Sequence, residues 1–376
     1  MIRKLTLRNF KAHWHADLRL SPLTLLTGAN GTGKSAVIQA LLLLRQSYQH
    51  NQLQKGLQLN KPLCEIGLGQ DALCEDLDAD QIRLGITDDE HEINWSFQVK
   101  GKDLDATFLK VVTPQELPAE APALFTENFQ YLSAERLSSQ ESYEKDNYSV
   151  ESERQISKNK GRGELVAHFL DFFGRREAAQ PIEALRFPAS DSPHLIDQTN
   201  YWLQQISPDV RVKVVSREKY FELSYQFEIE GQAPTRHLSP ANVGFGIAYA
   251  LPVIVAVLSA RPGSLIIIEN PEAHLHPSGQ AKLMELFTLA AEAGIQILLE
   301  THSDHILNGA LVAVKQGRIK PENTAVHYFA RQEGAHTAFA EEITISEYGS
   351  IDYQPDGFFD QIEKDMDVLL GLFNDL

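Results

Sequence analysis

Apolar residues in the first 27 positions fall into three short runs, IRKLTL, DLRL and LTLLT, and each run predicts a strand. A glycine-rich segment follows the third run. From residue 35 to about residue 48 the chain has no Gly or Pro, and its apolar residues form one broad face of a predicted helix: Val37, Ile38, Leu41, Leu42 and Leu44. Between about residues 60 and 130, runs such as IRLGI and INWSFQV alternate with polar turns and predict an antiparallel β region.

The pattern changes from about residue 141 to residue 205, where the chain becomes charged and helix-like. ELVAHFLDFFG predicts a helix that ends at a C-cap, Gly174, and TNYWLQQI predicts another short helix. After two strand-like runs, VRVKVVS and YFELSYQFEIE, a second α/β stretch begins near His237 and contains the apolar strands SLIIIEN and IQILLE and, later, AVHYFA. Uninterrupted apolar strands that alternate with helices predict a parallel sheet covered on both faces.

We therefore predict an α/β protein with a mixed or parallel central sheet, an antiparallel β region and an inserted helical lobe. The predicted boundaries are 1–140, 141–205, 206–345 and 346–376. The final stretch, FFDQIEKDMDVLLGLF, places apolar residues on one helical face: Phe359, Ile362, Met366, Leu369, Leu370 and Phe373. We expect this stripe to pack on the core of the protein, with docking of a partner as the alternative.

Composition and charge narrow the class of protein. Of the 376 residues, 43% are hydrophobic and 23% are charged, which is typical of a globular chain. The longest apolar run, 247–260, is too short to span a bilayer and contains Pro252, and the N-terminus lacks a secretion signal, so we expect a cytoplasmic protein without a membrane segment. Cys64 and Cys74 support neither a disulfide framework nor a four-ligand zinc site.

The formal net charge of −17 repels polyphosphate backbones and opposes tight nonspecific binding of nucleic acid. One local basic cluster, in ESERQISKNKGRG, leaves DNA binding open: Arg154, Lys158, Lys160 and Arg162. A solvated loop is the simpler interpretation of such a run.

The segment GANGTGKS matches the phosphate-loop pattern G-x-x-x-x-G-K-S and lies between a predicted strand and a predicted helix. In such a loop, backbone N–H groups and the helix N-terminus face the phosphates, Lys34 reaches the β- and γ-phosphates, and Ser35 ligates Mg²⁺. A glycine-rich turn that merely begins a helix is the alternative. The predicted ATP-binding residues here are Gly28, Asn30, Gly31, Thr32, Gly33, Lys34, Ser35 and Ala36.

Three further segments carry candidate chemistry. Glu269 ends the apolar strand before NPEAHLHP, and an acid at the end of a buried strand is costly unless it serves a cation, so we expect it to hold Mg²⁺ through water. His302 follows the strand IQILLE at the same sheet edge, where it could sense the γ-phosphate. In SPANVGFG, Asn242, Gly244 and Gly246 precede a helix and offer bare amides for an anion.

The order of these motifs resembles the ABC-type ATPase heads shared by SMC, RecF and OLD-type bacterial ATPases. LTLRNFKAHWHADLRLSPLTLLTGANGTGKS resembles the start of such heads, SPANVGFG occupies the place of their signature sequence, ENPEAHLHP resembles the Walker B segment and D-loop of the OLD-like branch, and ETHS resembles its H-loop. The C-terminal stretch is similar to the short tail of one set of small bacterial ATPases in that branch, through Pro355, Gly357, Phe358 and Phe359.

The resemblance implies a homodimer with two composite ATP sites, because in such heads the signature of one subunit covers the γ-phosphate bound to the other. It places Asn270 where the family usually has its catalytic glutamate, and an amide cannot accept a proton, so slow hydrolysis of ATP to ADP and phosphate is expected. Glu272 is the candidate for a base or for polarising the water, with a capping or D-loop role left open. For the Q-loop, Gln140 is the candidate metal contact, and Arg136 is the alternative link to the lobe.

Three functions remain open on this basis. The first is an ATP-driven conformational switch read by a separate effector, a nuclease or toxin, in bacterial anti-phage defence. The second is a RecF-like DNA-repair or recombination ATPase that clamps DNA. The third is an ATP-binding scaffold with little turnover. Only about 70 residues follow His302, too few for a nuclease domain, so we do not expect the chain itself to cut DNA.

Overall fold

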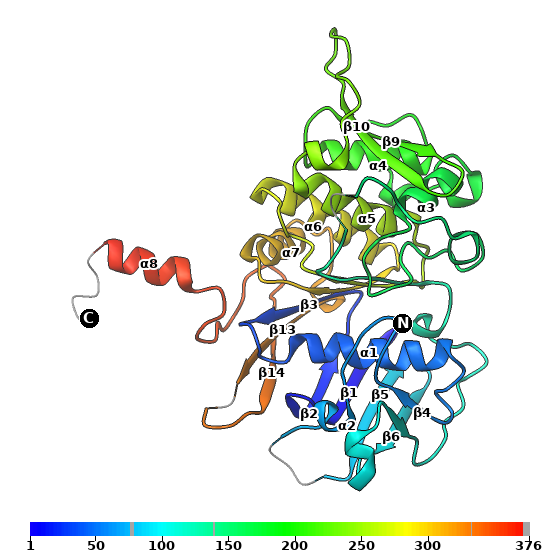
Figure 1. Cartoon of the computed structure of the whole chain (residues 1–376). Coiled ribbons are helices and arrows are strands. Elements are labelled where there is room, and N and C mark those ends of the chain that lie inside the picture. The colour runs from blue at the N-terminus through cyan, green and yellow to red at the C-terminus, as the bar shows by residue number, and fades with distance from the viewer. Residues whose placement is uncertain (76–78, 138–139, 332, 371–376) are drawn as a thin grey trace.

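A six-stranded sheet lies at the centre of the chain and separates two hydrophobic cores (Figure 1). The computed structural model describes residues 1–75, 79–137, 140–331 and 333–370. The strand order is β14-β13-β3-β12-β11-β8, with β14 Ala338–Ile343, β13 Thr324–Arg331, β3 Leu23–Gly28, β12 Gln296–Glu300, β11 Leu265–Glu269 and β8 Phe129–Leu132. All neighbours are parallel except β14, which runs antiparallel to β13 at the edge. The predicted mixed sheet is therefore confirmed.

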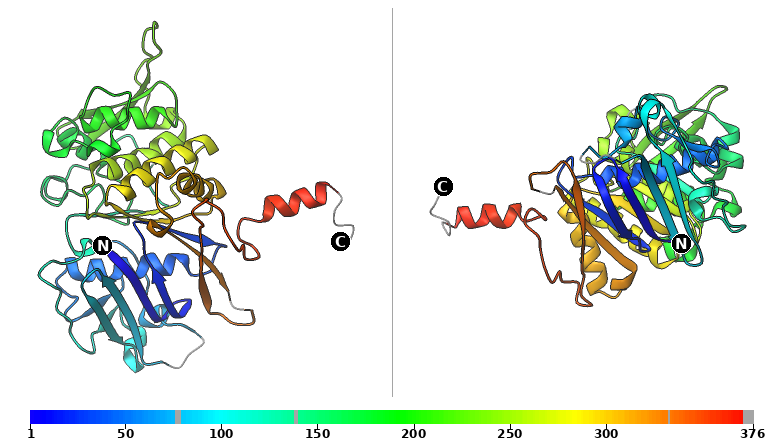
Figure 2. Two further views of the ribbon diagram at one scale, coloured as in Figure 1. Left: turned by 180° about the vertical axis from the view of Figure 1, so that it is seen from behind. Right: turned by 90° about the horizontal axis from the view of Figure 1, so that it is seen from below.

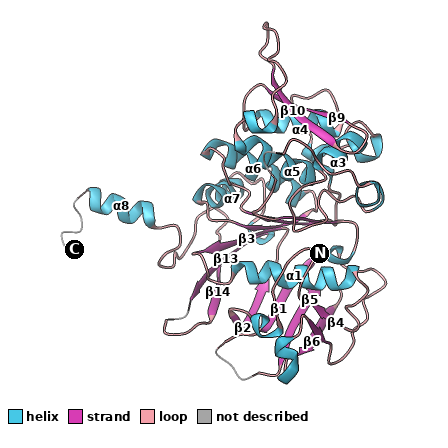
Figure 3. Ribbon diagram, viewed as in Figure 1, coloured by secondary structure: helices cyan, strands magenta, loops and turns pink. Residues whose placement is uncertain are grey.

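The N-terminal segment forms a second, antiparallel sheet in the order β2-β1-β5-β6. Its strands are β1 Ile2–Phe10, β2 His13–Arg19, β5 Gln81–Asp88 and β6 Glu92–Gln98, and beside them lie the two-stranded pair β4 Gly56–Gln58 with β7 Phe108–Lys110 and the short helix α2 Gly69–Ala72. Helix α1, Lys34–Gln49, lies between this sheet and the central one (Figures 1 and 3). One core therefore forms around α1.

Three helices cover the other face of the central sheet: α5 Phe245–Ser259, α6 Pro277–Glu292 and α7 Asp304–Lys315. The alternation of side chains along β11 explains why that strand is apolar up to its last residue, Glu269. Leu265 and Ile267 point into the core around α1, whereas Ile266 and Ile268 point into the core around α5. A strand buried on both faces has no solvent-facing position, as expected for a parallel sheet between helices.

The segment predicted as a helical lobe is only partly helical. It contains α3 Val166–Phe173 and α4 Leu195–Gln204, whereas 141–165 is mostly irregular with one π-helical turn, Tyr148–Ser152. Gly174 does end α3, but at φ −54°, so it is not the left-handed cap that glycine usually supplies there. The hairpin of β9 Val210–Ser216 and β10 Phe221–Phe227 follows, and the whole segment shares one core with α5.

The C-terminal helix, α8 Gln361–Leu369, projects away from the body in all views (Figures 1 and 2). Phe358 is buried and its ring lies against Tyr328, with Phe359 beside it. Beyond this anchor Ile362, Met366 and Leu369 are exposed, at 65%, 47% and 79%. The expectation that the whole stripe packs on the core was therefore wrong, and Phe373 lies outside the described residues. The chain turns away after Phe359, so the described part of the stripe beyond it is exposed: Ile362, Met366, Leu369 and Leu370.

Across the described part of the chain, no helix combines the length and the apolar character needed to cross a membrane. The apolar run predicted at 247–260 is instead the buried helix α5, which contains Pro252 and is enclosed between the central sheet and its neighbours.

Candidate functional site

The phosphate-loop segment joins β3 to α1 at the carboxyl edge of the central sheet. Gly28 has φ +133°, and a Cβ atom there would lie 2.3 Å from the carbonyl oxygen of Phe329 on the neighbouring strand, so only glycine fits. The Nζ atom of Lys34 donates to the carbonyl oxygens of Gly28 at 2.9 Å and Ala29 at 2.7 Å, so the lysine folds into the loop. Ala29, Asn30 and Gly31 at the tip are exposed. The side chain of Lys34 therefore fills the inner side of the loop, whereas the tip residues 29–31 are open to solvent.

The N-terminus of α1 has the properties of an anion site. Its N-cap is Gly33, without a side-chain cap, and its first turn contains no acidic residue. The first N–H groups of a helix have no partner inside the helix, and the helix dipole favours a negative charge there. Thr32 supports the loop, because its hydroxyl donates to the Ala29 carbonyl at 2.8 Å.

Two acids end the neighbouring strands β11 and β12 in register, since Glu269 pairs with Glu300. The Oε1 atom of Glu300 accepts a hydrogen bond from the Ser35 hydroxyl at 3.0 Å, whereas its Oε2 atom is buried without a partner. Burial, helped by the negative charge of Glu269, raises the pKa of Glu300 to about 7. Sequence reasoning had not selected Glu300 as a site residue.

Both carboxylate oxygens of Glu269 already have donors. Oε1 accepts from the Tyr131 hydroxyl at 2.9 Å, and Oε2 accepts from the Ala134 backbone N–H at 3.1 Å. Burial raises the pKa of Glu269 even so. This acid is thus held toward β8 and the segment that follows it.

Arg136 fixes the backbone next to Glu269. Its guanidinium, only 4% exposed, donates to the carbonyls of Glu269 at 2.6 Å and Asn270 at 2.8 Å, and lies 4.5 Å from the ring of Tyr249 on α5. The Tyr249 hydroxyl in turn donates to the Ala134 carbonyl. Arg136 therefore joins the end of β11 to α5, the helix that begins within SPANVGFG.

Asn270, Glu272 and His302 form the rim of the same edge. Asn270 has φ +45°, a left-handed conformation that asparagine tolerates better than glutamate does. The Oε1 atom of Glu272 accepts from the His302 backbone N–H at 2.8 Å, and its Oε2 atom is buried without a partner. His302 is exposed beside Gly28, and burial of part of the ring together with the charge of Lys34 lowers its pKa. The structure thus brings His302, Glu272 and the phosphate loop together.

The segment 239–246 has an open surface. Asn242 and Gly244 are exposed, and a Cβ atom added at Gly244 would meet nothing within 4 Å. Gly246 is different, because a Cβ atom there would lie 2.5 Å from the His274 carbonyl. The backbone at the start of α5 is therefore accessible from outside, while Gly246 is needed for packing.

Gln140 does not join these residues. It is exposed and lines a separate surface pocket with Tyr143 and Arg162. The structure gives it no contact with Ser35 or Glu269, so it does not support the predicted metal contact of Gln140.

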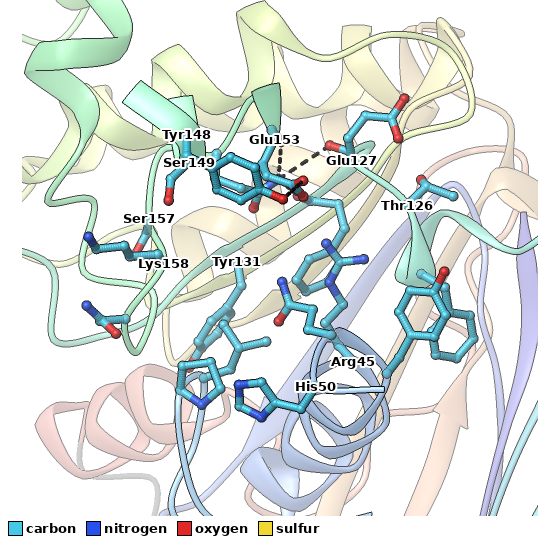
Figure 4. A pocket seen from close by; sticks show the side chains of 18 of the residues that line it. Arg45, His50, Thr126, Glu127, Tyr131, Tyr148, Ser149, Glu153, Ser157 and Lys158 are labelled. Atoms are coloured by element: carbon cyan, nitrogen blue, oxygen red, sulfur yellow. Dashed lines mark hydrogen bonds between the residues drawn. The ribbon is translucent and has the colours of Figure 1, made fainter. Parts of the chain in front are cut away.

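A cavity of about 570 Å³ opens at the far end of α1 (Figure 4). It is lined by Arg45, His50, Tyr131, Tyr148 and Lys158 among others. The α1 residues that line it begin at Arg45, which follows Lys34 by 11 positions or about 16 Å along the helix, so the cavity does not lie at the phosphate loop. Tyr131 forms part of its wall, and the hydroxyl of the same residue binds Glu269.

The residues at the sheet edge fit ATP and Mg²⁺. Lys34 and the N-terminus of α1 supply positive charge, and three buried oxygens lack a partner: Glu300 Oε2, Glu272 Oε2 and Asn270 Oδ1. A buried polar atom is costly until it gains one. Among the described residues, no group of three or more His, Cys, Asp or Glu forms a metal cage. Proteins usually hold Mg²⁺ through one or two carboxylates together with substrate phosphates, and Glu300 lies beside Ser35 of the phosphate loop.

Other side chains at the loop were also missed by sequence reasoning. His13 is fully buried, and its Nε2 atom lies 2.9 Å from the Gly33 carbonyl oxygen. Arg331, at the end of β13, donates to the Gly31 carbonyl at 3.2 Å. No local pattern marks either residue, because their positions depend on strand pairing. Glu300 did have a signal, since it ends a buried strand as Glu269 does.

The chain is similar to known families in sequence and to solved structures in fold. A family described as "AAA domain, putative AbiEii toxin, Type IV TA system" matches residues 23–308, and "Protein of unknown function (DUF3696)" matches residues 319–369. No curated protein matches the chain.

Two solved structures share the fold at low identity. One is an SMC head bound to the C-terminal winged-helix domain of ScpA, with 14% identity, a TM-score of 0.54 and coverage of 91% of this chain and 98% of that one. The other is a Smc head domain with an extended coiled coil bound to the C-terminal domain of ScpA, derived from Pyrococcus furiosus, with 12% identity, a TM-score of 0.51 and coverage of 99% of both chains. The chain, with its phosphate loop and SMC-head fold, belongs to the AAA-domain family that covers residues 23–308.

Proposed function

We propose that this protein is an ATP-driven switch, in which two copies close over two MgATP molecules, hydrolyse ATP slowly and present the closed state to a separate effector. The observation that carries the proposal is the edge of the central sheet, where the exposed phosphate loop and Lys34 lie beside two buried carboxylate oxygens without a partner, Glu300 Oε2 and Glu272 Oε2. Lys34 and the N-terminus of α1 bind the phosphates, and His302 lies beside Gly28, where it contacts the terminal phosphate.

Slow turnover follows from the residues next to Glu269. Asn270 cannot accept a proton, and Glu272 has one oxygen held by the His302 N–H and the other free. We propose that Glu272 orients or activates the attacking water. Burial raises the pKa of Glu272, which brings it closer to the range that suits a general base.

The dimer is proposed from the open surface at the start of α5. The first backbone amides of α5, from its N-cap Gly244 on, lie at an exposed helix N-terminus, whereas the Asn242 N–H already donates to the Ser239 carbonyl. In the proposed dimer these amides cover the γ-phosphate held by the other copy. Helix-terminal amides gain from such an anion because they have no partner of their own.

The effector is proposed to be a nuclease or toxin in bacterial anti-phage defence. The family description names a toxin of a type IV TA system, and both SMC heads were solved with part of a partner protein bound. Either kind of effector would leave the chemistry on nucleic acid or another target outside this chain.

The DNA-clamp alternative loses support from the basic cluster at residues 154–162. Lys158 pairs with Glu144 and Asp146, Lys160 pairs with Glu65, and Arg162 pairs with Glu135. Arg154 packs over the ring of Phe173. Cations that already have acidic partners offer little attraction to phosphates. The scaffold alternative differs from the switch only in the rate of hydrolysis.

The composite site can be tested by mixing two inactive variants. Lys34→Ala removes the phosphate contact, and Gly244→Asp places a charge where the partner's phosphate would lie, without a clash in its own chain. Each variant alone should be inactive. In a two-fold dimer their equal mixture should recover about a quarter of the wild-type ATPase rate, because half of the dimers carry one intact site of two. Gly244→Ala, which adds no charge, is the control.

The outcomes separate the alternatives. No recovery on mixing, together with no ATP-dependent rise in mass by light scattering, would exclude the composite dimer. If Glu272→Gln hydrolyses ATP as fast as wild type, the role given to Glu272 fails.

Co-purification with the products of neighbouring genes, with and without ATP, tests the effector. Binding that is the same with and without ATP contradicts a switch. ATPase activity stimulated by DNA and lost in salt would favour the clamp.

A further inference from the structure

Glu300 is a carboxylate in contact with Ser35, the phosphate-loop residue that is predicted to ligate Mg²⁺. It ends β12, whose neighbours are β3 on one side and β11 on the other, and it pairs in register with Leu26 and Glu269. Its side chain is therefore placed between the strand that enters the loop and the strand that carries the predicted metal-side acid. The hydrogen bond from Ser35 crosses from α1 to this position at 3.0 Å.

The two oxygens of Glu300 have different environments. Oε1 accepts the proton of the Ser35 hydroxyl, and since a hydroxyl has only one proton, the lone pairs of Ser35 remain available to a cation. Oε2 is buried and has no partner, in a residue that is only 7% exposed. A carboxylate oxygen in that state costs free energy until a cation or a donor reaches it.

Neighbouring groups do not supply that partner. Lys34 is directed to the carbonyls of Gly28 and Ala29. Among the described residues, no ion pair joins Lys34 to an acid. The charge of Lys34 favours the ionised form of Glu300, but burial and the like charges of Glu269 and Glu272 outweigh it, so the pKa of Glu300 stays raised and the site still favours a cation.

Of the two acids that end strands here, Glu269 is less suitable than Glu300 for binding a cation at Ser35. Its oxygens are occupied by the Tyr131 hydroxyl and the Ala134 N–H, both from β8 or the segment after it. To reach a cation at Ser35, Glu269 would have to give up at least one of these donors. Glu300 has an oxygen free and is already bonded to Ser35.

We propose that Glu300, together with Ser35, holds the Mg²⁺ of bound MgATP, directly or through its waters, and that Glu269 serves mainly to tie β11 to Tyr131 and Ala134. This inference rests on the proposed ATP-binding function and deepens it. Mg²⁺ takes oxygen ligands and keeps several waters, so one hydroxyl and one carboxylate beside the phosphates form a suitable set.

The test measures nucleotide binding by full-length protein, with Glu300→Gln and Glu269→Gln as a matched pair of isosteric variants. A fluorescent ATP analogue is titrated once with excess Mg²⁺ and once in EDTA, and the ratio of the two dissociation constants gives the gain in affinity due to Mg²⁺. Direct titration of Mn²⁺ by electron paramagnetic resonance, in the presence of ATP, gives a second readout. Neither measurement depends on hydrolysis.

Glu300→Gln should lose about 10- to 100-fold of the affinity gain due to Mg²⁺, the range found when a residue that supports a metal is removed. Its affinity in EDTA should stay equal to wild type or improve, because one negative charge beside the triphosphate is gone. Glu269→Gln should keep most of the gain, and Glu300→Asp should lie between Glu300→Gln and wild type.

Three results would overturn the inference. The first is a full Mg²⁺ gain in Glu300→Gln, and the second is a loss of gain in Glu269→Gln alone. The third is equal weakening of Glu300→Gln in Mg²⁺ and in EDTA, which would show that Glu300 only shapes the loop. If wild type binds no ATP analogue in either condition, the proposed function itself fails, and that outcome is distinct from the three above.

Discussion

Replacing Glu300 by Gln should stabilise the nucleotide-free protein at neutral and alkaline pH. In the absence of ligand, this carboxylate is buried, one of its oxygens lacks a partner, and it lies beside Glu269. Burial is the larger cause of its raised pKa, and the charge of Glu269 adds to it. The ionised form is therefore less stable in the folded chain than in the unfolded chain.

The size and sign follow from the two pKa values. The folded pKa of about 7 lies above the ordinary value of 4.5, so the destabilisation is absent below pH 4.5, grows as the pH rises and is complete above about pH 7. Since a pKa shift of one unit corresponds to about 1.4 kcal/mol, the full effect on the free energy of unfolding is about 3 kcal/mol. Gln cannot ionise, but its amide N–H groups need acceptors, which lowers the net gain at pH 8 to about 1–2 kcal/mol.

The assay is urea unfolding of wild type and Glu300→Gln in EDTA without nucleotide, at pH 5 and pH 8. The difference in free energy of unfolding between the two proteins should grow by up to about 3 kcal/mol from pH 5 to pH 8. Histidines titrate in both proteins and cancel in the comparison. Glu218→Gln, at an exposed position, is the control and should show no such trend. A difference that is the same at both pH values would refute the reasoning.

Four further predictions concern other residues. Lys34→Ala should reduce ATP hydrolysis by about 10²- to 10³-fold in a phosphate-release assay, since it removes a preorganised cation, and wild-type activity would contradict the phosphate-loop interpretation. Arg136→Lys should lower the free energy of unfolding by about 2 kcal/mol in urea, because one ammonium cannot replace the fork that binds the Glu269 and Asn270 carbonyls; an unchanged urea midpoint would argue against that role. Asn270→Glu should destabilise the protein by at least about 1 kcal/mol, through its left-handed backbone and a further buried acid, and stability equal to wild type would show that the edge tolerates both. Leu369→Asp should change the free energy of unfolding by no more than about 0.5 kcal/mol, because Leu369 is 79% exposed on α8, and a large loss would mean that α8 packs on the body.

Several parts of the fold are decided by local pattern, and these were predicted correctly. Short strand-like runs predicted β1, β2 and β3, an apolar helical face without Gly or Pro predicted α1, and uninterrupted apolar runs predicted the parallel strands β11 and β12. The phosphate loop is equally local, because its glycines, lysine and serine lie within eight consecutive residues. In such segments the chemistry and the conformation depend on neighbours in the chain.

Other features depend on which strands lie side by side, and the sequence alone did not determine them. Ser35 and Glu300 are 265 positions apart and meet because β12 is inserted between β3 and β11. Arg136 reaches the end of β11 because β8 is the neighbour of that strand. Gln140 lines a separate surface pocket and not the sheet edge, and α8 leaves the body after Phe359. Hydrophobic periodicity determines which face of an element is buried, but only the tertiary structure decides what that face and its ends will contact.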